Sequence, residues 1–387
     1  MRRSGAVLLF ALAAALAARP APAADPVQRV ALEGETLDTL ELEIVFDGID
    51  WTDAAAVARA KAGIDAVLQA RLEIQLALVL GAEFAREYRE LVDPAALRRE
   101  AQREDLEDAR RQSALVAGAT IEAVLGKAET PAENRVVYPL LVTARAEGKE
   151  LFKNRCRIDL ARVESGQWRV IRDETLCADC EGSGKRREKS CAGCDGRGWV
   201  ANPHRGFPEG LHAERPLEEV GPSTPRDSAI AFLSRRLALS RWLLAGFAAK
   251  VGPAYREYCT RFFAPGVLGA PETPSVFTAQ ISYEPGEEIQ DGSGASVMVR
   301  ETITPAQGKA ESTWIRVNVL SPVKGRWLVS AFGLSCPACQ GSGKCAQCRG
   351  TGLEAKGNPC PSCEGMKTCL ACQGKRIVPA ELLSPRW

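Results

Sequence analysis

Apolar residues recur at helical spacing in two stretches of the chain. In the first stretch, Thr52 or Asp53 can cap a helix whose apolar positions lie on one face. Asp93 and Pro94 are typical of the cap and first turn of a second helix. The apolar positions of the first helix are Val57, Ile64, Val67, Leu68, Leu72 and Leu76.

The second helical stretch runs from Ser228 to Lys250. Gly252 and Pro253 predict an interruption there, because proline lacks the N–H that continues a helix. A short further helix is expected from Tyr255 to Phe263. The apolar positions of the longer helix are Ile230, Leu233, Leu237, Trp242 and Leu244.

Downstream of each helical stretch, polar and apolar residues alternate with the period of a half-exposed strand. A Gly-x-Trp-x-Val segment follows at 166–170 and again at 325–329, and each tryptophan lies nine residues before a cysteine. The chain therefore contains one unit twice. The residues expected to share a strand face are Cys156, Ile158 and Leu160 in the first copy, and Ile315, Val317 and Val319 in the second.

Twelve of the 14 cysteines form six Cys-x-x-Cys pairs, most of them followed by x-Gly-x-Gly. Two intervening residues let the chain turn so that both sulfurs face one tetrahedral ion at about 2.3 Å. Two such knuckles complete a Cys₄ site without an open position, which is typical of structural zinc. We therefore expect three zinc ions, with twelve ligands: Cys177, Cys180, Cys191, Cys194, Cys336, Cys339, Cys345, Cys348, Cys360, Cys363, Cys369 and Cys372.

These repeats resemble the cysteine-rich domain of DnaJ-type chaperones, over 177–198 and 336–372. The resemblance implies a nested order, in which the first of four knuckles pairs with the fourth and the second with the third. Sequential pairing stays open, because the gaps are short and the last two knuckles lack the second glycine. The implied groups are Cys336, Cys339, Cys369 and Cys372; Cys345, Cys348, Cys360 and Cys363; and, in the first module, Cys177, Cys180, Cys191 and Cys194.

Helices followed by long antiparallel strands predict an α+β fold, with two duplicated helix-then-antiparallel-sheet domains that each precede a small zinc-knuckle module. The domains resemble cystatin-like cones of the nuclear-transport-factor and SnoaL type. The predicted order is a signal peptide at 1–24, an N-terminal extension at 25–50, the first domain at 51–176, the first zinc module at 177–198, a linker at 199–226, the second domain at 227–335, the second zinc module at 336–375 and a tail at 376–387.

The signal peptide is predicted from Arg2 and Arg3, the apolar run 6–18 and the small residues at 21–24, with cleavage after Ala23 or Ala24. A retained membrane anchor is the alternative, although the run is shorter than the ~20 residues that span a bilayer. We expect a periplasmic or extracellular protein without a membrane segment after cleavage.

Several functional classes lose support from the sequence. The two histidines, His204 and His212, belong to no His-Pro-Asp tripeptide, so a J domain and an Hsp70-type partner are not supported. They also offer no Ser/His/Asp arrangement. The net charge of +1 and the scarcity of aromatic residues in the knuckles argue against nucleic acid.

The favoured interpretation is a non-enzymatic, exported zinc protein that binds protein partners, including unfolded clients. The alternative is a thiol–disulfide oxidoreductase or isomerase that uses the Cys-x-x-Cys pairs. A cone-pocket enzyme is a third class, for which no residue can be named. Cys156 and Cys259 stand apart from the pairs and are expected to be buried thiols, with a disulfide between them as the alternative.

Overall fold

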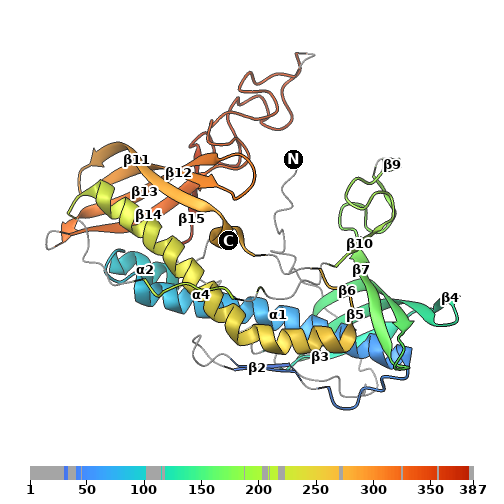
Figure 1. Cartoon of the computed structure of the whole chain (residues 1–387). Coiled ribbons are helices and arrows are strands. Elements are labelled where there is room, and N and C mark those ends of the chain that lie inside the picture. Colours follow the sequence, from blue (N-terminus) through green and yellow to red (C-terminus); the bar gives the residue numbers. More distant parts are fainter. Residues whose placement is uncertain are drawn as a thin grey trace.

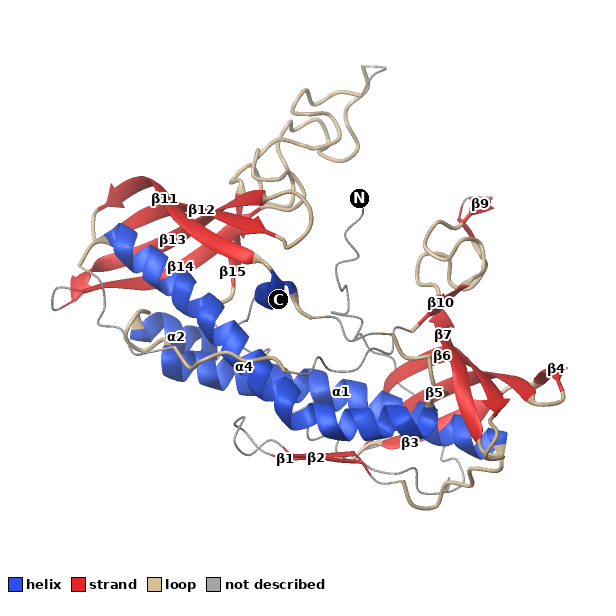
Figure 2. Ribbon diagram, in the orientation of Figure 1, coloured by secondary structure: helices blue, strands red, loops and turns tan. Residues whose placement is uncertain are grey.

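The computed structural model describes residues 30–33, 41–44, 46–101, 115, 118–186, 188–202, 208, 210–216, 223–269, 273–323, 326–354 and 357–382 of the 387-residue chain. Two antiparallel sheets lie at opposite ends of a pair of long helices (Figure 1, Figure 2). The predicted α+β class is therefore confirmed. The predicted signal peptide lies outside the described residues.

The first long helix, α1, spans Ala54–Glu87 and begins as predicted. Its N-cap is Asp53, whose carboxylate accepts the N–H of Ala55 at 2.8 Å. The short helix α2, Pro94–Ala101, starts with the predicted proline, and the Asp93 carboxylate accepts the N–H of Ala96 at 2.9 Å.

The second long helix, α4, spans Pro225–Phe262 without a break, so the predicted interruption at Gly252 and Pro253 is wrong. Pro253 removes one helical hydrogen bond. The residues on both sides of it are buried, among them Val251 and Tyr258, and their packing offsets that loss. Thr224 caps the helix and accepts the N–H of Asp227 at 3.1 Å.

The first sheet has the strand order β10-β7-β6-β5-β3, with β4 also paired to β5, and the second has the order β11-β12-β13-β14-β15. Two further antiparallel pairs, β1 with β2 and β8 with β9, are short. A single turn of helix, α5 (Ser275–Thr278), precedes β11. The strands are β1 Val30–Glu33, β2 Glu41–Ile44, β3 Thr120–Leu125, β4 Glu129–Ala132, β5 Arg135–Ala146, β6 Lys149–Arg162, β7 Trp168–Leu176, β8 Lys185–Arg186, β9 Lys189–Ser190, β10 Trp199–Ala201, β11 Gln280–Asp291, β12 Gly294–Thr304, β13 Glu311–Val323, β14 Arg326–Ser335 and β15 Ile377–Ala380.

The predicted strand faces are correct. Ile158 and Leu160 on β6 are buried against the helices, with Cys156 half-buried beside them. The corresponding residues of β13 form part of the second core: Ile315, Val317 and Val319.

Each of the two hydrophobic cores combines both long helices, which lie side by side (Figure 1). The start of α1, with Ile64, and the end of α4, with Phe262, pack on the first sheet. The end of α1, with Phe84, and the start of α4, with Phe232, pack on the second sheet. The helices are therefore antiparallel, and each core contains half a helix from each repeat. This sharing of helices was not part of the sequence-based prediction.

The strands β10 and β15 lie outside the predicted α+β domains. Strand β10 is made by the first three residues of the predicted linker, and β15 by residues of the predicted tail. Each one extends the sheet of its own repeat by pairing with the strand that carries the Gly-x-Trp segment, β7 or β14. Among the described residues, no helix is long and apolar enough to cross a membrane.

Candidate metal centres

Both knuckle modules are excursions from a two-stranded hairpin. The first lies between β7 and β10, where Leu176 pairs with Trp199. The second lies between β14 and β15, where Ser335 pairs with Ile377. Because the two strands leave the sheet together, both modules project away from the layer of helices (Figure 1).

The twelve predicted ligands come together in three groups of four, and within each group the sulfurs all lie within 4.8 Å of one another. Sulfurs from partner knuckles are 3.7 or 3.8 Å apart in every group, for example Cys177 to Cys191 at 3.8 Å and Cys180 to Cys194 at 3.7 Å. A tetrahedral ion with four bonds of about 2.3 Å requires sulfurs about 3.8 Å apart. The geometry therefore fits zinc.

In the second module the groups follow the nested order. They are Cys336, Cys339, Cys369 and Cys372 in one centre, called the outer centre below, and Cys345, Cys348, Cys360 and Cys363 in the other, the inner centre. Backbone hydrogen bonds link the same knuckles. The N–H of Cys336 donates to the carbonyl of Arg376 at 2.8 Å, and that of Cys345 to Lys367 at 3.0 Å.

A common backbone turn aims the sulfurs in all six knuckles. The residue after the second cysteine is left-handed, with φ between 50° and 52°, and a positive-φ glycine follows it. The turn directs later N–H groups toward the sulfur. Gly198 donates to the sulfur of Cys194 at 3.2 Å, and Gly352 to that of Cys348 at 3.3 Å.

The second glycine of the motif is required where two knuckles touch. A Cβ on Gly184 would lie 2.2 Å from the carbonyl oxygen of Gly196, and one on Gly198 would lie 2.3 Å from that of Gly182. The last two knuckles of the second module lack this glycine, and Lys367 and Arg376 adopt φ of 67° in its place. The missing glycines therefore leave the turn intact at a cost in backbone strain.

Backbone donors outweigh burial at one sulfur of each centre, whereas burial raises the pKa of five other knuckle thiols: Cys177, Cys194, Cys360, Cys363 and Cys372. At Cys348, burial is outweighed by the N–H groups of Gly352 and Gly350 and by neighbouring thiols, so that its pKa is lowered to about 6. The same balance lowers the pKa of Cys180 and of Cys339 to about 7. Stabilised thiolates are the form in which cysteine binds a metal ion.

The donor set supports a closed structural site. Each centre offers four sulfurs, and the cysteines that carry them are at most 8% exposed. Four thiolates satisfy tetrahedral zinc completely and leave no position for water or substrate. The three tetra-cysteine groups are consistent with three zinc ions.

Comparison with known proteins adds little to this geometry. No protein-family model and no curated protein matches the chain. Among solved structures, an "Ntf2 like protein involved in plasmid conjugation" is similar with a TM-score of 0.16 and 10% identity, covering 59% of this chain and 87% of that one. Such a low TM-score carries no argument, so the resemblances to cystatin-like cones and DnaJ-type modules stay predictions.

The lone cysteines lie in the first core, away from the metal centres. Cys259 on α4 is buried and Cys156 on β6 is half-buried, and both are free thiols. Burial raises the pKa of Cys156 to about 12 and that of Cys259 to about 11.

A buried ion cluster in the same core was missed from the sequence. The ammonium group of Lys61 is fully buried and lies 2.5 Å from the Asp173 carboxylate, and it also pairs with Asp65. The sequence spacing indicates that Lys61 is buried, because it lies four residues after Val57 and three before Ile64, on the apolar face of α1.

Proposed function

We propose that this chain is an exported, non-enzymatic zinc protein whose knuckle modules bind protein partners, with apolar segments of unfolded clients as the preferred target. The observation that carries the proposal is the set of three closed Cys₄ groups on two projecting modules. A closed site has no position for a substrate, so its role is structural. Zinc binding there supplies folding free energy to a module that is too small to bury a core.

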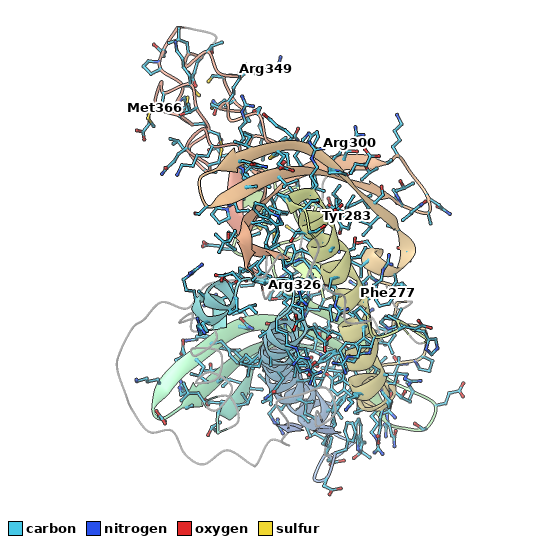
Figure 3. The ribbon with its side chains drawn as sticks, turned by 90° about the vertical axis from the view of Figure 1, so that its left-hand side faces the viewer. Phe277, Tyr283, Arg300, Arg326, Arg349 and Met366 are labelled. Atoms are coloured by element: carbon cyan, nitrogen blue, oxygen red, sulfur yellow. The ribbon has the colours of Figure 1, made fainter. Side chains whose placement is uncertain are left out.

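The second module offers an apolar surface for such a partner. The side chains of Leu353, Met366 and Leu370 in this module are 51%, 52% and 43% exposed. Figure 3 shows Met366 in the part of the chain that projects beyond the second sheet. Exposed apolar side chains on a projecting module are typical of an interaction surface, and methionine adapts to varied partners.

The client proposal can be tested with reduced, carboxymethylated α-lactalbumin, a permanently unfolded protein, by fluorescence anisotropy. Replacing Leu353, Met366 and Leu370 by serine should weaken binding at least tenfold while three zinc ions are retained. In the matched control, Val124 and Ile289 are replaced by serine. These residues lie outside the modules and are 48% and 54% exposed, so this variant should bind like the native protein. Equal binding by both variants, or no binding by the native protein, would contradict the proposal.

Export is proposed from the basic, apolar and small residues at positions 2–24. N-terminal sequencing of the protein from cells that export it tests this directly. A chain that starts at Ala24 or Asp25 supports the proposal, and a chain that retains Met1 contradicts it.

The oxidoreductase alternative requires an accessible sulfur. The knuckle cysteines are at most 8% exposed, which disfavours it. Thiols of the zinc-loaded protein should therefore react slowly with a disulfide reagent until a chelator is added, whereas fast reaction before chelation would favour the alternative.

A further inference from the structure

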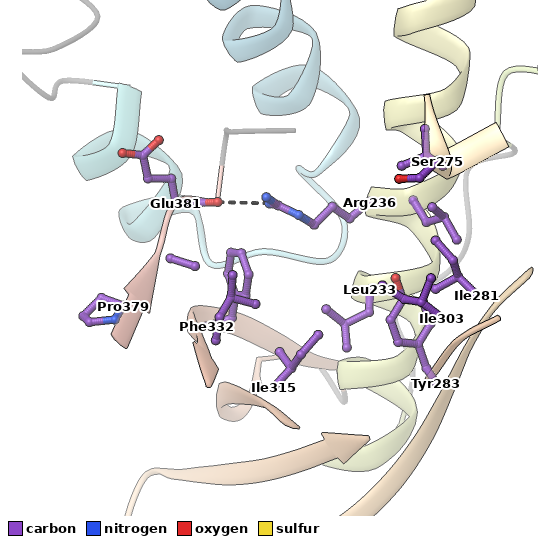
Figure 4. Close-up of a pocket in the computed structure, with 14 residues that line it drawn as sticks. Leu233, Arg236, Ser275, Ile281, Tyr283, Ile303, Ile315, Phe332, Pro379 and Glu381 are labelled. Carbon is purple, nitrogen blue, oxygen red and sulfur yellow. Dashed lines mark hydrogen bonds between the residues drawn. The ribbon is translucent and has the colours of Figure 1, made fainter. Parts of the chain in front are cut away.

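The second repeat contains a cavity of about 300 Å³ between the first half of α4 and the second sheet (Figure 4). Most of its lining is aliphatic or aromatic, including Leu233, Ile281, Ile303 and Ile315. This volume is at the lower end of the range of ligand pockets, which are mostly apolar with a few polar groups that fix orientation.

Arg236 is the one cation among the described residues that line the cavity. It is 8% exposed, and its Nη1 donates to the carbonyl oxygens of Glu381 at 3.0 Å and Leu382 at 3.1 Å. Its guanidinium lies 4.6 Å from the ring centroid of Phe332. Figure 4 shows the Glu381 carboxylate pointing away from Arg236 while its carbonyl faces the guanidinium.

The matching positions of the first repeat are filled differently. Eight residues after its N-cap, α1 carries Lys61 where α4 carries Phe232. Five residues after the Gly-x-Trp tryptophan, β7 carries Asp173 where β14 carries Phe332. At these matching positions the first repeat therefore has a buried ion pair, and the second has two aromatic side chains in contact.

One wall of the cavity is formed by the strand that follows the outer centre in the chain. Pro379 and Ala380 of β15 and the adjacent Glu381 line the cavity, and β15 pairs with β14 at the edge of the sheet. The hydrogen bond from Cys336 to Arg376 immediately precedes this pairing. The outer centre joins the two ends of the module, so an ion bound there would hold β15 against β14.

We propose that this cavity binds a small, mainly apolar carboxylate, with the carboxylate at Arg236, and that zinc in the outer centre holds its wall in place. Arginine is the side chain best suited to a planar carboxylate, and the aliphatic lining suits the remainder of the ligand. This function is separate from client binding, which uses the exposed surface of the module.

Calorimetric titration with octanoate and 4-phenylbutyrate tests the ligand class, with 4-phenylbutanol as the neutral control. At least one acid should bind at one molecule per chain, and 4-phenylbutanol at least fivefold more weakly than 4-phenylbutyrate. Filling the cavity by Ile303→Trp or Ile281→Trp should weaken binding at least tenfold, whereas Val124→Trp on the exposed part of β3 should not. No binding by either acid, equal binding of the alcohol, or unchanged binding by both cavity variants would overturn the proposal.

The role of zinc is tested by Cys369→Ser in the outer centre, with Cys191→Ser in the first module as the matched control. Each variant should retain two zinc ions and its helical circular dichroism. Cys369→Ser should weaken acid binding at least tenfold and Cys191→Ser should leave it unchanged. Equal binding by the two variants would overturn the proposed coupling.

Discussion

Val92, just beyond the end of α1, pairs with Val329 in β14 of the other repeat. The N–H of Val329 donates to the carbonyl of Leu91 at 2.8 Å, and the Val329 carbonyl accepts the N–H of Asp93 at 2.7 Å. The first repeat makes the reciprocal contact. Val170 of β7 pairs with Phe263, just beyond the end of α4. In each repeat, the valine of the Gly-x-Trp-x-Val segment therefore pairs with the residues that follow the long helix of the other repeat.

This exchange predicts that the repeats fold together. Cleavage at a protease site introduced within residues 203–207 should leave the two fragments associated in gel filtration, because each hydrophobic core contains helix halves from both. Each fragment alone should lack a cooperative thermal transition. Separate elution of two fragments that each melt cooperatively would contradict this prediction.

The buried ion cluster should be sensitive to the loss of one member. Burial opposes the charged form of Lys61, but Asp173 and Asp65 outweigh it and raise the pKa of Lys61. Lys61→Met would leave buried Asp173 without this cation and should lower the free energy of unfolding by about 3–5 kcal/mol. Urea denaturation measures the change, and a loss below about 1 kcal/mol would show that the cluster contributes little.

The second repeat suggests a pair of substitutions that should restore part of the lost stability. Phe232 and Phe332 occupy the matching positions there, with ring centroids 5.4 Å apart. The double variant Lys61→Phe, Asp173→Phe should therefore be more stable than the sum of the single losses predicts, since each single substitution leaves a buried charge uncompensated and the double one leaves neither Lys61 nor Asp173 charged. Additive losses in the double-mutant cycle would contradict this.

Zinc loss from paired substitutions distinguishes the nested from the sequential order. Cys339 and Cys369 belong to one centre, so replacing both by serine should remove one zinc ion of the three. Cys339 and Cys348 belong to different centres, so replacing both should remove two. Elemental analysis gives the count, and the opposite result would establish sequential pairing.

The contact between knuckles should make one glycine critical. Gly184→Ala would place a methyl group 2.2 Å from a backbone oxygen, whereas Gly48→Ala, also at positive φ, would meet nothing within 4 Å. Both substitutions carry a backbone strain of about 1–2 kcal/mol, but only Gly184→Ala also meets a backbone atom and lies in the first zinc module. Gly184→Ala should release zinc from the first module at lower chelator concentrations than Gly48→Ala does, and identical release curves would contradict the contact.

Local patterns predicted much of the fold. The sequence predicted Asp93 as one cap and Thr52 or Asp53 as the other, because a side-chain oxygen before an apolar stripe is a local signal; the structure selects Asp53. The strand faces and the six Cys-x-x-Cys pairs follow from short spacings for the same reason. The nested order of the second module came only from the resemblance to DnaJ-type repeats, since the spacings left sequential pairing open. At Pro253 the local signal was misleading, because long-range packing sustains α4.

The remaining features depend on contacts between distant segments. The exchange of helix ends joins Val92 to Val329, and no spacing within either repeat encodes that choice of partner. The edge strand β15 is four residues long and follows a knuckle, so its pattern was too short to stand out. The cavity beside Arg236 requires β15, α4 and four other strands at once.

Zinc K-edge X-ray absorption, combined with elemental analysis of the purified chain, tests the central claim most directly. Three zinc ions per chain, each with four sulfur neighbours at about 2.3 Å, are predicted. Fewer than two zinc ions in a folded protein whose twelve knuckle cysteines have formed disulfides would contradict it.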